Sequence, residues 1–216
     1  MNLQHPVRTL IGIVATAMSI VGAVFLVCRA ATEGSTWHVV SFSIYGTSLV
    51  ALWAVSTIYH SLNVSRAAHR TLEQIDHAMI YFLIAGTYTP LCLVVLRGGW
   101  GWSLFGVNWA LAIAGIVLKL TFRTPRPWLV AFLFGSYLLM GWLIVIAWSP
   151  LVHAISGGGI FWLLAGGLFF TLGTVVLNMK GLQSNETFGA HEIWHLFVLA
   201  GGASHFWFML RHVLTP

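Results

Sequence analysis

Charged residues are scarce in this 216-residue sequence, which has five Asp and Glu and ten Lys and Arg. Together they make up 7% of the chain, whereas ordinary soluble domains carry roughly 25%. Hydrophobic residues make up 58%, so there is too little polar side chain to cover a soluble globule of this size. The composition therefore predicts a protein embedded in a lipid bilayer.

Neither the cysteines nor the basic residues indicate a secreted or a nucleic-acid-binding protein. Cys28 and Cys92 both lie in apolar stretches, so we expect packing residues, and two cysteines make no disulfide framework. The net charge of +5 does not indicate nucleic-acid binding, because the basic residues are scattered over loops and form no stripe. We therefore expect membrane lipids as partners, and no nucleic acid.

The sequence is rich in apolar runs of about 19 to 25 residues, the length that crosses a bilayer as a helix. Breaks at Pro, Gly or charge divide the chain into seven such runs. They cover approximately residues 7–30, 37–62, 75–96, 102–120, 128–148, 160–178 and 191–214. The sequence thus predicts an all-α bundle of seven transmembrane helices, with residues 1–216 as one integral domain of a multi-pass protein in the cell membrane.

The basic residues are distributed unequally between the two ends of these helices. One end collects seven of them, Arg8, Arg66, Arg70, Lys119, Arg123, Arg126 and Lys180. The other end collects three, Arg29, Arg97 and Arg211. Because Lys and Arg accumulate in cytoplasmic loops, the amino terminus is predicted to be cytoplasmic and the carboxyl terminus extracytoplasmic.

Three histidines and one aspartate lie near the ends of otherwise apolar segments, where ionisable groups are costly. His60 ends the second expected helix, Asp76 begins the third, and the seventh begins with His191 and His195. Residues four apart on a helix are rotated by only about 40° and lie about 6 Å apart, so His191 and His195 face one point. With His60 from another helix they form the three-histidine set of a catalytic zinc site, and we expect a buried Zn²⁺.

Asp76 is expected to act beside this ion. Zinc lowers the pKa of a bound water to about 7, and a neighbouring carboxylate can then move the proton as a general base. An N-cap role at the start of the third helix is compatible with this. Ser56 lies one turn before His60, where it either orients a ligand or the substrate, or bonds back to its own helix.

Other polar residues near these motifs are assigned structural roles. His205 lies about 15 Å beyond His195 along the helix, too far to share an ion held by bonds of about 2.1 Å, so we expect a hydrogen bond to a neighbouring helix. His77 is predicted to make a supporting or interhelical bond, and Glu192 to compensate the helix dipole. The remaining histidines lie in loops or at helix ends and indicate no function: His5, His38, His69, His153 and His212.

These motifs resemble those of the hemolysin III branch of the progestin and adipoQ receptor family, within a larger group that includes the alkaline ceramidases. The matching elements are Ser56-x-x-x-His60, Asp76-His77 followed by residues 81–90, and His191-x-x-x-His195 with the later His205. The resemblance implies seven helices, a cytoplasmic amino terminus and a zinc held by the three histidines, with Asp76 beside the bound water. It also implies lipid amide hydrolysis, as in the ceramidase relatives.

Two functions are consistent with these observations. The first is a zinc-dependent intramembrane hydrolase that acts on a lipid-like amide or ester. The second is a non-catalytic membrane sensor or receptor, in which zinc is structural and locks the second and seventh helices together. An ion transporter is disfavoured because the outer half offers few acidic ligands, and a cytolytic protein because so apolar a chain is typical of a resident membrane protein.

The two ends of the chain are predicted to lie on opposite sides of the membrane. In a variant without native cysteines, Thr215→Cys should react with a membrane-impermeant maleimide on intact cells. Asn2→Cys should react only after permeabilisation, because the asymmetry of the basic residues retains the amino terminus inside. Labelling of both positions from the same side would show that the number of spans is wrong.

Overall fold

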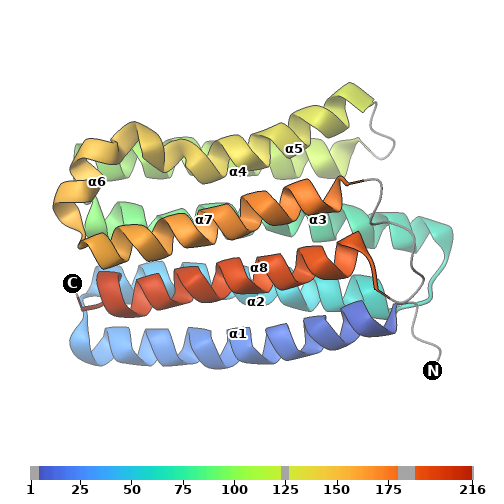
Figure 1. The fold of residues 1–216 in the computed structure, drawn as a ribbon, viewed down its shortest axis with the longest axis horizontal. Helices are drawn as coiled ribbons and strands as arrows, with labels where there is room; N and C mark the ends of the chain where they lie inside the picture. The colour runs from blue at the N-terminus through green and yellow to red at the C-terminus, as the bar shows by residue number, and fades with distance from the viewer. Residues whose placement is uncertain (1–4, 123–126, 180–187, 216) are drawn as a thin grey trace.

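The structure is a computed structural model that describes residues 5–122, 127–179 and 188–215. In these segments the chain forms helices and no strand. Seven helices are long and apolar enough to cross a membrane, and they lie side by side in one bundle (Figure 1). The predicted seven-helix transmembrane bundle is confirmed, while its orientation in the membrane stays a prediction.

The helices correspond to the predicted spans, with several irregular continuations. A π-helical segment, Leu91–Val95, continues α3, and a 3₁₀ segment, Leu143–Ala147, joins α5 to α6. A second π-helical segment, Met209–Val213, follows the last helix. The bounds are α1 (Pro6–Glu33), α2 (Thr36–Ser61), α3 (Arg66–Pro90), α4 (Gly99–Thr121), α5 (Pro127–Trp142), α6 (Trp148–Ala154), α7 (Gly157–Leu177) and α8 (Ala190–Phe208).

Helix α3 begins at Arg66, well before the predicted start at residue 75. Its first turns are too polar to resemble a membrane span, but they are rich in residues with good helix propensity. Ser65 caps them, since its Oγ accepts the Ala68 N–H at 3.4 Å. Asp76 therefore lies well inside the helix, and the predicted N-cap role of Asp76 is wrong.

Helix α3 occupies the centre of the bundle. Of its most apolar window, 67% is buried inside the protein, compared with 22% for α1. Glycines let neighbouring elements approach it closely: Gly86 of α3 lies against Ser48 of α2, and Gly115 of α4 lies against the ring of Tyr81. The central helix thus provides a fixed support for the side chains that it carries, Asp76 among them.

Both cysteines are free, as expected. Cys92 is buried in the core, whereas Cys28 is exposed on the outer surface of α1. The packing role predicted for both cysteines is therefore seen at Cys92 alone.

We predict that Gly86→Ala destabilises the bundle and that Gly106→Ala does not. A methyl group at Gly86 would overlap the Ser48 side chain, whereas nothing lies within 4 Å of one at Gly106. Overpacking costs about 1–3 kcal/mol, so thermal unfolding in detergent should show a lower transition for the first variant only. Equal stability of the two variants would contradict the close contact between α2 and α3.

Candidate metal centre

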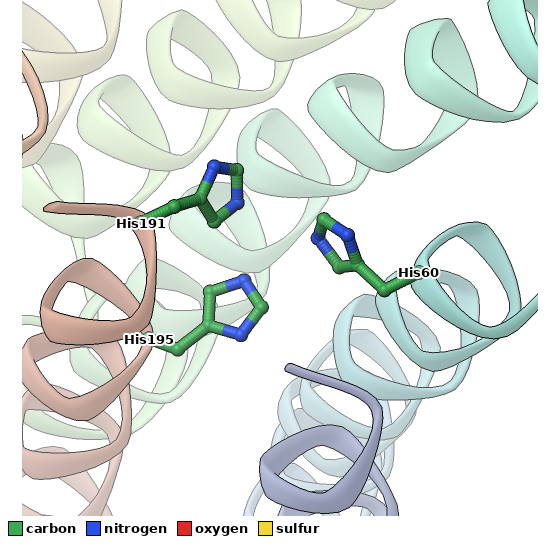
Figure 2. A group of neighbouring side chains, drawn as sticks. All are labelled: His60, His191 and His195. Carbon is green, nitrogen blue, oxygen red and sulfur yellow. The ribbon is translucent and has the colours of Figure 1, made fainter. Parts of the chain in front are cut away.

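Three histidines from two helices face one another at one end of the bundle. His60 lies in the last turn of α2, and the other two lie in the first turns of α8. Their rings point toward a common space between the helices (Figure 2). The ring centroids are 5.0 Å apart for His60 and His191, 5.1 Å for His60 and His195, and 5.0 Å for His191 and His195. The structure therefore brings together all three residues that the sequence suggested as ligands.

The burial and pairing of these rings fit a metal ion. His60 is 2% exposed and His195 is 4% exposed. Within the described part of the chain, both ring nitrogens of His60 and Nδ1 of His195 have no hydrogen-bond partner, a costly state for buried polar atoms. One nitrogen from each of the three rings lies within 4.8 Å of the others. Two buried histidines and one partly buried histidine in this arrangement can form a metal site.

The start of α8 is fixed by Glu192, which lies between the two candidate ligands His191 and His195 in sequence. Its Oε2 accepts the backbone N–H of Gly189 at 2.8 Å, which satisfies a free donor at the helix start. Its Oε1 accepts from Nε of Arg8 at 2.6 Å. Glu192 does lie in the first turn as expected, but sequence analysis did not predict its partner on α1.

His5 is a second residue that sequence analysis missed. Its ring lies edge-on to the His60 ring, with centroids 5.8 Å apart, and its backbone N–H donates to the His60 carbonyl at 3.2 Å. Burial lowers the pKa of the His5 imidazole, and the nearby positive charge of Arg8 lowers it further. The only available signal was the predicted topology, which placed the amino terminus at the same membrane face as the histidine cluster.

The residues proposed for catalysis line one cavity with two of the clustered histidines. This cavity of about 150 Å³ is bordered by Ser56, Asp76, His191 and His195 at one end. The side chain of Asp76 is half-buried, and it lines the same cavity as the Ser56 hydroxyl. The walls beyond are mostly apolar and come from α2, α3, α5, α7 and α8. A carboxylate and a hydroxyl thus share a largely apolar cavity with two of the candidate ligands.

The other polar residues considered above make structural contacts. Nε2 of His205 lies 3.2 Å from the Leu163 carbonyl of α7, which is the interhelical contact predicted for it. At His77 the contact is made by the backbone, because its carbonyl accepts the Tyr137 hydroxyl at 3.1 Å, while its Nδ1 has no partner in the described residues. Neither ring belongs to the histidine cluster.

Comparison with known proteins gives matches along most of the chain. The sequence profile of haemolysin-III related proteins matches residues 3–206. The chain is 39% identical over 201 residues to Hemolysin-3 of Bacillus cereus and 41% identical over 197 residues to the Hemolysin-3 homolog of Bacillus subtilis (strain 168). These alignments cover 93% and 91% of this chain and 88% of each relative. It is also 30% identical over 184 residues to human Monocyte to macrophage differentiation factor, covering 82% of this chain and 72% of that protein.

We predict that the purified protein carries about one transition-metal ion per chain. His191→Ala and His195→Ala should each remove most of it and lower the thermal unfolding temperature, because a ligand bound only to the folded state stabilises that state. His205→Gln, on the same helix but outside the cluster, should retain the metal. Elemental analysis that finds full occupancy in both alanine variants would refute the site.

Proposed function

The chain belongs to the haemolysin-III related family and is a multi-pass protein of the cell membrane, and we propose that it is a zinc-dependent intramembrane hydrolase of a lipid-like amide or ester. The observation that carries this proposal is the cavity in which Asp76 and Ser56 lie beside His191 and His195. A general base, a hydroxyl and metal ligands in one pocket are the components of metal-assisted hydrolysis.

The chemistry of the donor set favours zinc. Three histidines with a remaining position for water or substrate are typical of catalytic zinc sites, whereas structural sites are usually closed by four ligands. In the described segments no fourth His, Cys, Asp or Glu joins the cluster. His60, His191 and His195 would hold the ion, which when bound polarises a carbonyl group and makes water acidic enough to attack it near neutral pH.

Asp76 would handle the protons of the reaction. As a carboxylate it takes a proton from the attacking water onto one of its oxygens, and it then returns that proton to the nitrogen or oxygen of the leaving group. Ser56 lines the same cavity as Asp76. Ser56 is therefore proposed to orient the base, and it lies one turn from His60 on the same helix.

The walls of the cavity support a lipid-like substrate. The rest of the cavity is bordered mostly by apolar side chains, including Leu83, Phe134, Leu138 and Phe170. Such walls suit an alkyl chain, with a small number of polar groups to orient the reacting end. A substrate bound with its amide or ester at Asp76 and its chain between α3, α5 and α7 would satisfy both parts.

A structural role for zinc is the competing proposal. All three histidines lie at the ends of α2 and α8, so an ion could lock these two helices in a sensor or receptor without any reaction. This alternative predicts no separate role for Asp76, because that residue is not part of the histidine cluster.

We predict that Asp76→Asn keeps zinc but lowers hydrolytic turnover by about 10² to 10⁴-fold, the usual contribution of general acid–base catalysis. Glu73→Gln, which removes another acid from the same helix, serves as the matched control and should leave turnover unchanged. The assay uses long-chain amides and esters in detergent or vesicles, with the metal content measured in parallel.

Full activity of the Asp76→Asn variant would contradict Asp76 as the base. Failure of the zinc-loaded wild type to hydrolyse any of these amides or esters would support the sensor in place of the hydrolase.

A further inference from the structure

An ion pair joins the first and the last helix beside the histidine cluster. Nε of Arg8 on α1 donates to Oε1 of Glu192 on α8 at 2.6 Å, and the two side chains are 22% and 7% exposed. Removal of one partner from a largely buried pair leaves an uncompensated charge, which is strongly destabilising. The contact is therefore expected to persist, and it fixes one turn of α1 against the first turn of α8.

Both carboxylate oxygens of Glu192 have partners outside the histidine cluster. Oε1 is bound by Arg8 and Oε2 by the backbone N–H of Gly189. Glu192 follows His191 directly in sequence, yet it is not part of the histidine cluster. The two contacts thus define the rotation of this first helical turn, and this rotation decides where His191 and His195 point.

The same turn of α1 also contacts the end of α2. The backbone N–H of His5 donates to the carbonyl of His60 at 3.2 Å, and the Thr9 hydroxyl donates to the carbonyl of His5 at 2.9 Å. Helix α1 packs against both α2 and α8, whereas the backbones of α2 and α8 stay apart over most of their described length. Helix α1 thus contacts both of these helices beside the cluster, in addition to direct side-chain contacts between α2 and α8 such as that of Trp53 with His195.

We infer that the Arg8–Glu192 ion pair is a positioning device for the metal centre. It holds His191 and His195 where they can bind the same ion as His60. Neither Arg8 nor Glu192 is part of the histidine cluster, and both act through the helix that carries two of the ligands. This inference rests on the proposed zinc site and assigns a function to two residues outside it.

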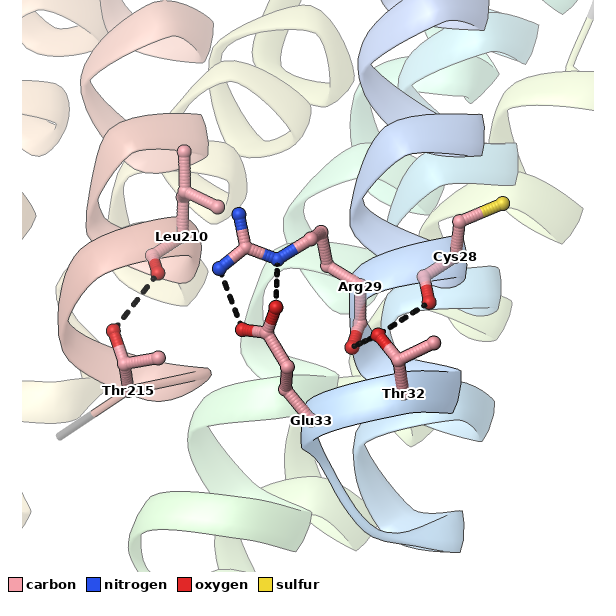
Figure 3. Close-up of polar contacts among 6 residues, drawn as sticks. All are labelled: Cys28, Arg29, Thr32, Glu33, Leu210 and Thr215. Atoms are coloured by element: carbon pink, nitrogen blue, oxygen red, sulfur yellow. Dashed lines mark hydrogen bonds and ion pairs between the residues drawn. The ribbon is translucent and has the colours of Figure 1, made fainter.

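The chain offers a matched control at the opposite end of the same helix. Arg29 and Glu33 form an ion pair in which both side chains are 39% exposed (Figure 3). They are four residues apart on α1, so this pair connects no two helices. Its removal deletes the same types of charge from the protein without loosening α8.

The test compares zinc affinity among variants of the two pairs. Chelator competition on the full-length protein in detergent should give zinc binding about 10- to 100-fold weaker for Arg8→Ala and for Glu192→Gln, the usual effect of losing a residue that supports a ligand. The double variant should bind no more weakly than the worse single variant, because the two residues act as one unit. Arg29→Ala and Glu33→Gln should bind zinc like the wild type.

Arg8→Lys keeps the charge but lacks the guanidinium fork, so it should recover part of the affinity. Should Arg8→Ala fail to fold, Arg8→Lys and Glu192→Gln supply the measurement.

Thermal unfolding without zinc is measured for every variant. Lower stability with unchanged zinc affinity would show that the pair only stabilises the fold, and it would overturn the inference while leaving the zinc site intact. Absence of zinc binding in the wild type would instead refute the proposed site itself.

Discussion

Polar groups inside this bundle must find partners within the protein, because the surrounding lipid offers none. Most of them do so locally: the hydroxyls of Thr87 and Thr89 donate to carbonyls one turn earlier on α3, both at 2.8 Å. His60 departs from this pattern, since neither of its ring nitrogens has a partner in the described residues. A metal ion shared with His191 and His195, as proposed above, would supply the partner that His60 lacks.

The same requirement shapes the irregular fifth span. The Tyr88 hydroxyl of α3 donates to the Gly141 carbonyl and accepts the Ile144 N–H, both at 2.8 Å. It thereby satisfies backbone groups where the α-helical pattern of α5 changes to a 3₁₀ segment. Helix α3 thus carries Asp76 near the histidine cluster and, further along, supports another wall of the cavity through Tyr88. Helix α3 therefore contributes to the cavity wall both at Asp76 and at Tyr88.

The sequence predicted those features that depend on local pattern. Long apolar runs predicted seven helices, and the four-residue spacing of His191 and His195 predicted a shared face. The polar beginning of α3 was missed, because a search for apolar runs does not detect a helix whose first turns are charged. For the same reason the predicted N-cap role of Asp76 was wrong. The contact between Arg8 and Glu192 was also missed, since it depends on how α1 packs against α8, and no periodicity encodes that packing.

The origin of the histidine cluster in α2 and α8 has a consequence for biosynthesis. Helix α2 precedes α8 in the chain and is therefore translated before it. An ion that requires all three histidines would therefore be captured only after α8 has been translated. Metal loading would then follow the synthesis of α8, and a chain truncated before His195 would leave the candidate site incomplete.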